Sequence, residues 1–284
     1  MYTIVKKREL NPYVTLLQIE APFIAAKAQP GQFVILRADE DDERVPFAIA
    51  EWDRQAGTVS IIFRTVGATT EKLNMKKEGE AIADIVGPLG SVTDTEGVKK
   101  ACIVAGGVGS AIALPIVRHL HEQGAEVTLI IGFRNKSNFM LAEEFNSASD
   151  KLYPMTDDGS FGRYGSVCVQ LQKLFDEGET FDLVFTVGPL TMMKRVVDVT
   201  RPTGIPCTVS MNPIMIDGTG MCGGCRITLL RDGERVTSFA CVEGPEYNGY
   251  EVDFDEAIWR GNMYLHEEGE AREAVCNLYR KAVE

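Results

Sequence analysis

The sequence is poor in histidine, in long apolar runs and in positive charge. It contains three histidines, and its 29 lysines and arginines stand against 41 aspartates and glutamates, a net charge of −12. This balance repels phosphate backbones and anionic membrane surfaces, so we expect no nucleic acid and no membrane as a partner. The one long apolar stretch, residues 101–117, contains several glycines and Pro115. It is better explained by a buried strand that runs into a helix than by a membrane span.

Several catalytic and targeting motifs are also absent. The sequence has no G-x-S-x-G elbow, no H-E-x-x-H motif and no P-loop, which leaves hydrolysis and phosphoryl transfer without candidate residues. No apolar segment follows Lys6, Lys7 and Arg8, so we expect no signal peptide and a cytoplasmic location. The seven cysteines are an odd number, which argues against a disulfide framework. Redox chemistry is the class that remains.

The spacing of the apolar runs divides the chain into four regions. Residues 1–97 alternate short β-type runs with turn residues, which predicts an antiparallel β-barrel. Residues 98–212 alternate strands with helices, which predicts an α/β domain with a doubly wound parallel sheet. Residues 213–245 form a loop region rich in glycine and cysteine, and residues 246–284 form an acidic tail with helical periodicity. We therefore expect two main domains followed by a small C-terminal part.

A glycine-rich turn follows the first strand of the α/β half. The run Gly106-Gly107-Val108-Gly109 lies between an apolar strand and a helix, where backbone N–H groups and the helix dipole bind a pyrophosphate. The run is not a complete G-x-G-x-x-G motif, and a tight turn without a ligand is the alternative. A second turn, Gly188-Pro189, ends a later parallel strand and is expected at the same edge of the sheet. Two such turns at one edge favour a dinucleotide site.

Two further features concern the same edge. Arg134 follows the second parallel strand, where it is placed to meet either a 2′-phosphate or the pyrophosphate, so NAD and NADP both stay open. Asp158 and Gly159 form either a plain acidic turn or a sheet edge that faces a nicotinamide. The dinucleotide candidates are Gly106, Gly107, Val108, Gly109, Arg134, Asp158, Gly159, Gly188 and Pro189.

The barrel half carries a second group of candidates. Arg44 precedes a strand and is able to neutralise a pyrophosphate, while the strand offers backbone groups to a flat ring. A short helix that begins near Val66 supplies hydroxyl and N–H groups, although a plain helix cap explains the same residues. The barrel candidates are Arg44, Pro46, Phe47, Ala48, Ile49, Val66, Gly67, Thr69, Thr70, Gly87 and Gly90.

The strongest motif lies in the loop region. Asp217, Cys222, Cys225 and Cys241 follow the plant-type spacing of [2Fe-2S] ligands, with aspartate in the first position. The glycines between them suit a loop that wraps around a cluster and points backbone N–H groups at sulfur. A zinc site with three thiolates and one carboxylate is the main alternative, and a reversible Cys222–Cys225 disulfide is another.

Together, the Arg44-Val45-Pro46-Phe47 barrel, the Gly106-Gly107-Val108-Gly109 turn and the cysteine loop resemble the ferredoxin-NADP reductase superfamily. The run from Met211 to Cys225 is similar to the small-subunit family of NADH-dependent reduced ferredoxin:NADP+ oxidoreductases, also called sulfide dehydrogenase small subunits. In that family aspartate similarly takes the first cluster position. Members of the superfamily often carry serine or threonine facing the flavin where this chain has Ala48.

This resemblance implies a set of cofactors and partners. It implies FAD in the barrel, NAD(H) or NADP(H) on the α/β domain, and a [2Fe-2S] cluster at Asp217, Cys222, Cys225 and Cys241. It also implies a heterodimer with a larger subunit that carries its own FAD and [4Fe-4S] clusters, and through it an indirect link to ferredoxin. The expected function is electron transfer between NAD(H), FAD and the cluster within an electron-bifurcating oxidoreductase.

Two alternatives stay open at this stage. The electron-transfer subunit of dihydroorotate dehydrogenase has the same layout but normally four cysteines at its cluster, so Asp217 points away from it. A non-catalytic nucleotide-binding module stabilised by zinc is the alternative outside the enzymes. Metal analysis separates the zinc module from both electron-transfer readings.

Overall fold

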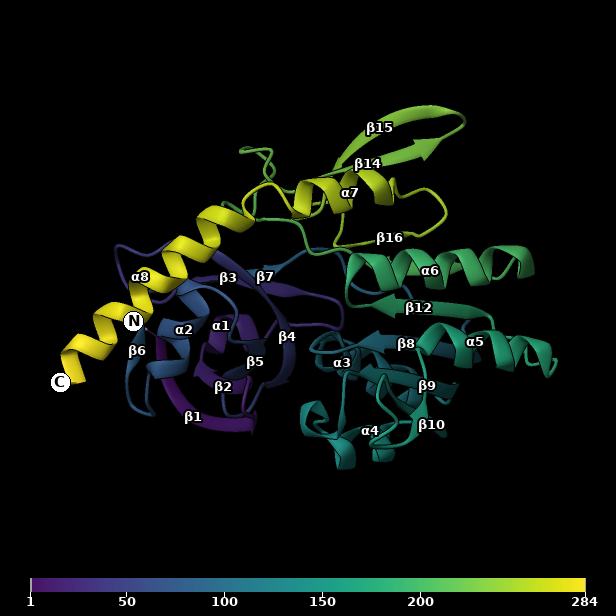
Figure 1. Cartoon of the computed structure of the whole chain (residues 1–284), viewed down its shortest axis with the longest axis horizontal. Coiled ribbons are helices and arrows are strands. Elements are labelled where there is room, and N and C mark those ends of the chain that lie inside the picture. Colours follow the sequence, from purple (N-terminus) through teal and green to yellow (C-terminus); the bar gives the residue numbers. More distant parts are fainter. Residues whose placement is uncertain (1, 284) are drawn as a thin grey trace.

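A computed structural model describes residues 2–283 of the chain, with side chains described up to residue 276. Two large sheets lie side by side, and a smaller lobe with a two-stranded hairpin lies beside them (Figure 1). None of the helices in the described part of the chain combines the length and the apolar character that a membrane crossing needs.

The first sheet is antiparallel and forms a nearly closed barrel with strand order β6-β1-β2-β5-β4-β3-β7. Its interior is filled by aliphatic and aromatic side chains at alternate strand positions, such as Leu17, Ile19 and Ile61. The elements are β1 (Tyr2–Asn11), β2 (Val14–Glu20), α1 (Pro22–Ala25), β3 (Phe33–Arg37), β4 (Val45–Asp53), β5 (Thr58–Arg64), α2 (Ala68–Met75), β6 (Ala81–Ile82) and β7 (Asp84–Leu89).

The second sheet has the order β11-β10-β9-β8-β12-β13-β16, and every pairing in it is parallel except that of β13 with β16. Its central strands are almost wholly apolar because helices cover both faces, α3 and α4 on one side and α5 and α6 on the other. The elements are β8 (Lys100–Gly106), α3 (Gly109–Glu122), β9 (Glu126–Phe133), α4 (Ala142–Ala148), β10 (Lys151–Thr156), β11 (Arg163–Tyr164), α5 (Val167–Asp176), β12 (Leu183–Val187), α6 (Leu190–Thr200) and β13 (Cys207–Ser210), with 3-10 turns at Lys136–Asn138 and Arg201–Thr203.

The C-terminal part begins after the parallel sheet and makes contacts with both the sheet and the barrel. It contains the hairpin of β14 (Arg226–Arg231) and β15 (Glu234–Phe239), then β16 (Glu246–Asn248), α7 (Phe254–Gly261) and α8 (Leu265–Val283). Helix α8 runs back across the barrel (Figure 1), where Arg272 donates to Glu71 of α2 at 2.8 and 3.1 Å. The expectation of a helical tail over 246–284 thus omits a strand: β16 pairs with β13 and completes the parallel sheet.

The two sheets also share an apolar interface. Val14, Ala50 and Ile62 on the outer face of the barrel pack into the same core as the buried face of α3. Strand β5 is therefore buried on both of its faces from Thr58 to Phe63. This packing fixes the barrel against the carboxyl edge of the parallel sheet.

Candidate dinucleotide cavity and cysteine loop

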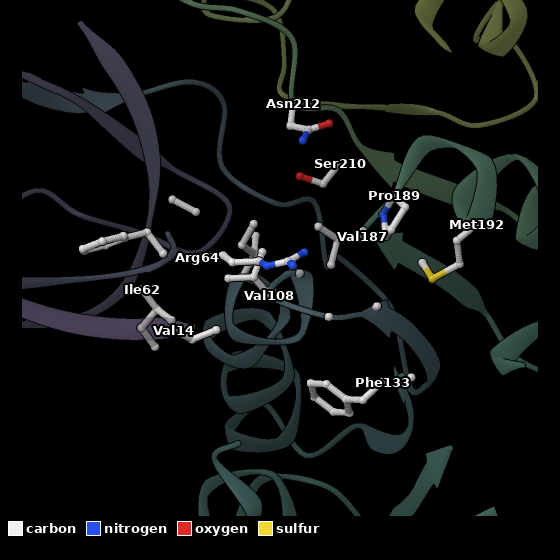
Figure 2. Close-up of a pocket in the computed structure, with 18 of the residues that line it drawn as sticks. Val14, Ile62, Arg64, Val108, Phe133, Val187, Pro189, Met192, Ser210 and Asn212 are labelled. Atoms are coloured by element: carbon white, nitrogen blue, oxygen red, sulfur yellow. The ribbon is translucent and has the colours of Figure 1, made fainter. Parts of the chain in front are cut away.

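A cavity of about 840 Å³ lies between the barrel and the parallel sheet. Residues at or just after the carboxyl ends of five parallel strands line it: Gly106, Phe133, Asp157, Val187 and Ser210. Figure 2 shows Val187, Ser210 and Phe133 around this space, with Val14 and Ile62 on the barrel side. In open α/β sheets this edge is where ligands bind, so the cavity is the candidate functional site.

The barrel supplies one wall of the cavity. Pro46, Phe47 and Ala48 of β4 line it, and so do Val66 and Thr70 next to the start of α2. The hydroxyl of Thr70 accepts hydrogen bonds from the backbone N–H groups of Val66 and Gly67, both at 2.9 Å. Thr70 therefore holds the turn before α2 in place beside the cavity.

The other barrel candidates do not line the cavity. Arg44 donates to Asp84 of β7 at 2.7 Å, Thr69 donates to Glu43 at 2.9 Å, and Ile49 is buried in the barrel core. Arg44 lies one residue before β4, and its ion pair with Asp84 uses the charge that was expected to face a phosphate. The remaining candidates outside the lining are Gly67, Gly87 and Gly90.

Arg64, which the sequence analysis did not select, extends into the cavity from the end of β5 (Figure 2). Its side chain makes no hydrogen bond or ion pair with another residue in the described part of the chain. One signal was available: Arg64 is the single charge, at the end of an otherwise uncharged strand. The structure therefore makes Arg64, rather than Arg44, the barrel cation that is free to meet a ligand.

The glycine-rich turn forms the opposite wall. Gly106, Gly107, Val108 and Gly109 all line the cavity, as do Gly188 and Pro189 at the end of β12. A side chain at Gly109 would place its Cβ 2.7 Å from the carbonyl oxygen of Val187, so glycine lets α3 begin directly against β12. The two predicted turns thus meet at one edge of the sheet.

Two features of the cavity favour an anion. The first turns of α3, α5 and α6 contribute lining residues, so three helix N-termini direct backbone N–H groups and positive dipole ends toward it. The charged lining residues are Arg64, Arg134 and Arg195 against one carboxylate, Asp157. This excess of positive charge stands out in a chain whose net charge is −12, and it fits pyrophosphate groups.

Only part of the acidic turn after β10 faces the cavity. Asp157 lines the cavity, whereas the candidates Asp158 and Gly159 do not. The Asp158 carboxylate accepts hydrogen bonds from the hydroxyl and the backbone N–H of Ser160, at 2.6 and 2.9 Å. These bonds hold the pKa of Asp158 below its usual range, so Asp158 stabilises its own turn.

The cysteine loop lies at the start of the C-terminal lobe. The Sγ atoms of Cys225 and Cys241 are 3.2 Å apart, and both residues are buried. Burial and the adjacent Cys225 raise the pKa of Cys241 to about 12, while the backbone of Gly220 donates a hydrogen bond to it. Two buried thiols in contact become thiolates when a metal centre supplies positive charge, so the pair fits half of a cluster site.

The other two predicted ligands form a second pair. The Asp217 carboxylate accepts hydrogen bonds from the backbone N–H groups of Thr219 and Cys222, both at 2.7 Å, and they lower its pKa. Cys222 is exposed, and its sulfur accepts from the N–H of Gly224 at 3.5 Å. Within the described residues no three metal-binding side chains form one group. The donor set of three thiols and a carboxylate still fits an iron–sulfur cluster.

Comparison with known proteins identifies the family. Residues 212–253 match the iron–sulfur cluster-binding domain of dihydroorotate dehydrogenase B. The chain is 43% identical to a homologue of the dihydroorotate dehydrogenase B electron-transfer subunit from Thermotoga maritima. The match covers 93% of this chain and 92% of the relative. The chain belongs to the family of these electron-transfer subunits and their homologues.

Two solved structures are similar to this chain over most of its length. The chain is 39% identical to a chain in the structure of an NADH-dependent reduced ferredoxin-NADP oxidoreductase, with a TM-score of 0.90 over 100% of this chain and 98% of that one. Phthalate dioxygenase reductase, at 17% identity and a TM-score of 0.59 over 85% of this chain and 93% of that one, shares the fold. The predicted barrel plus α/β architecture and the superfamily resemblance are confirmed.

The family also settles the class of chemistry. The electron-transfer subunit is part of an oxidoreductase, and the predicted cofactor set of FAD, NAD(H) and a [2Fe-2S] cluster is confirmed at the level of the family. The runner-up of the sequence analysis, the dihydroorotate dehydrogenase subunit, is the name that the Thermotoga relative carries. Both readings therefore share one coarse function, electron transfer as a subunit of a larger oxidoreductase.

The segment that joins the parallel sheet to the cysteine loop also lines the cavity. Ser210, Met211, Asn212 and Met215 contribute to the lining, and Pro245 does so from the returning chain. Figure 2 shows Ser210 and Asn212 above the cavity. The sequence analysis did not select them, although their place after a parallel strand was a usable signal. They form the wall between the cavity and the cluster loop.

Glu246 lies where the three parts of the electron-transfer subunit meet. Its Oε1 accepts a hydrogen bond from the Thr93 hydroxyl at 2.7 Å, and a Cβ on Gly31 would lie 2.8 Å from the same oxygen. Its register partner on β13 is Ser210, which lines the cavity. Burial raises the pKa of Glu246 to about 7, and the bond from Thr93 offsets only part of that effect.

This carboxyl group makes stability depend on pH. Its pKa in the folded state lies above the ordinary value of 4.5, so the folded protein favours the protonated carboxyl group. The stability present at pH 4, where this group is protonated, is lost as the pH rises toward about 7. At pH 8 we expect the free energy of unfolding of Glu246→Gln to exceed that of the parent by on the order of 1 kcal/mol. Near pH 4 the two free energies should be equal. Urea titrations at both pH values measure this, and an equal difference at pH 4 and pH 8 contradicts it.

Proposed function

We propose that this chain is the small subunit of an electron-bifurcating, NADH-dependent ferredoxin:NADP+ oxidoreductase. In this role it passes electrons between NAD(H), FAD and a [2Fe-2S] cluster, and exchanges them with a larger subunit that has its own FAD and [4Fe-4S] clusters and links the chain indirectly to ferredoxin. The observation that carries the proposal is the 39% identity and TM-score of 0.90 over the whole chain to a protein of that description.

The geometry supports the first half of this route. The cavity has room for a flat ring on Pro46, Phe47 and Ala48 and for pyrophosphate groups at the helix N-termini and free arginines. Bound FAD would accept the two electrons of a hydride together and release them one at a time. The chain's own residues hold the ligands and exclude water, and no general acid or base of the hydrolase kind is needed.

The cluster loop supports the second half. Asp217, Cys222, Cys225 and Cys241 would hold the [2Fe-2S] cluster, with aspartate in place of the first thiolate. Glycines at positive φ, such as Gly218 and Gly220, let the loop turn around the cluster. Met211 and Met215 line the cavity and belong to the same apolar core as Cys225 and Cys241.

Co-purification tests the identity of the partner. The tagged chain, expressed in its own host under anaerobic conditions, is expected to bring down a larger flavoprotein that contains iron beyond the two atoms of one [2Fe-2S] cluster. The purified pair is expected to reduce ferredoxin and NAD+ together when given NADPH. A pair that reduces NAD+ at the expense of dihydroorotate instead overturns the proposal.

That second outcome is the alternative function, an electron-transfer subunit for dihydroorotate oxidation. The family name of the Thermotoga relative favours it. Metal analysis of the purified chain addresses the non-enzyme alternative, because zinc without iron or acid-labile sulfide would indicate a zinc-stabilised nucleotide-binding module.

A further inference from the structure

The backbone of the cluster loop comes close to the barrel at Gly218. Gly218 follows the predicted ligand Asp217 and has a φ of +76°. A Cβ at this position would lie 2.7 Å from Cδ1 of Leu89 and 3.2 Å from Cδ1 of Ile35. Both of these side chains belong to the barrel, on β7 and β3. Glycine thus lets the loop backbone approach the barrel more closely than any other residue would allow.

The barrel side of this contact leads directly to the cavity. Ile35 and Phe33 lie two residues apart on β3 and therefore on the same face of the strand. Phe33 lines the cavity, and it is the register partner of Leu89. The side chains of Phe33 and Ile35 share one core with Cys225 and Cys241, and Leu89 packs against that core. A continuous apolar contact therefore runs from the cavity wall to the cluster thiols.

We propose that the close packing of Gly218 on Leu89 and Ile35 sets the separation between the flavin and the cluster. Gly218 is then a positioning residue for electron transfer, and this role depends on the function proposed above. One of the two electrons that NADH delivers as a hydride leaves the flavin and reduces the oxidised cluster, while the other stays on the flavin until a partner has taken the first. Only this one-electron step depends on the separation.

An added methyl group should act on that step alone. Leu89 and Ile35 are packed in the core, so a Cβ at position 218 pushes the loop away rather than entering between them. The rate of electron transfer between two redox centres falls as the distance between them grows. For Gly218→Ala we therefore expect flavin reduction by NADH at the parent rate and a several-fold loss in the flavin-to-cluster rate.

Three companion variants separate this contact from backbone strain. Gly79→Ala is the strain control, because Gly79 has a φ of +86° in a barrel turn with no atom within 4 Å of its Cβ. Leu89→Ala combined with Gly218→Ala makes room for the added methyl group. Leu89→Phe pushes on the loop from the barrel side and leaves the loop sequence unchanged, so it gives an answer even if Gly218→Ala fails to keep its iron.

The experiment uses the purified chain with its cofactors, mixed anaerobically with NADH while flavin and iron–sulfur absorbance are followed separately. A second readout, the thermal unfolding midpoint of the cofactor-free chains, tests the contact without electron transfer. We expect slow cluster reduction in Gly218→Ala and Leu89→Phe, a parent rate of cluster reduction in Gly79→Ala, and recovery of that rate in the double variant. Gly218→Ala should also lower the unfolding midpoint less when residue 89 is alanine than when it is leucine. Parent cluster-reduction rates in Gly218→Ala and Leu89→Phe, or no recovery in the double variant, overturn the inference. If the parent chain itself does not pass electrons from NADH to its cluster, the proposed function fails instead.

Discussion

Replacing Cys225 with alanine is expected to remove the iron–sulfur cluster from the purified chain. Cys225 is 1% exposed and its sulfur lies 3.2 Å from that of Cys241, so no other side chain can take its place. Iron and acid-labile sulfide should fall to background, because a cluster needs all of its ligands. Flavin reduction by NADH should persist, since the cavity does not include Cys225.

Cys207→Ala is the matched control for this result. Cys207 is also a buried thiol, and burial raises its pKa to about 12, but it lies on β13 within the parallel sheet. The Cys207→Ala chain should keep its full iron content. A Cys225→Ala chain with the same iron and sulfide as the Cys207→Ala chain would contradict the ligand assignment.

The second large effect is expected at Arg64. Replacing it with alanine should weaken FAD binding by the cofactor-free chain about tenfold to a hundredfold. A hydrogen bond to a charged group contributes about 1.5–3 kcal/mol, and 1.4 kcal/mol corresponds to a factor of ten in affinity. Arg64 lines the cavity and has no protein partner among the described residues, so its charge is available to a pyrophosphate.

Arg44→Ala is the comparison for Arg64→Ala. Arg44 is tied to Asp84 at 2.7 Å and lies outside the cavity lining, so its loss should change FAD affinity by less than about threefold. Titration of the flavin-free variants with FAD, read by quenching of flavin fluorescence, measures both. A larger loss for Arg44→Ala than for Arg64→Ala would return the role to Arg44.

The pattern of apolar residues was sufficient to predict the two sheets and the two glycine turns. The run Gly106-Gly107-Val108-Gly109 lies between β8 and α3 and lines the cavity, as a strand–turn–helix pattern requires. Helix α2 was predicted to begin near Val66, and it begins at Ala68. These features depend on local periodicity and turn chemistry, which the sequence displays directly.

The features that could not be predicted depend on contacts between distant residues. Strand β1 is half exposed and carries three consecutive basic residues, so it lacks an apolar pattern. Arg44 and Arg64 are equally plausible phosphate ligands until Asp84, forty residues from Arg44, is seen to bind one of them. Likewise, nothing near Glu246 in the sequence indicates that β16 joins β13 and brings it against Thr93.

The central claim is that this chain relays electrons from a nicotinamide through a flavin to its own cluster. An anaerobic titration of the purified chain with NADH, with flavin and iron–sulfur absorbance read together, tests it most directly. We predict that both chromophores bleach, the flavin first and the cluster after it. A chain reconstituted with FAD and iron in which NADH bleaches neither chromophore would contradict the account.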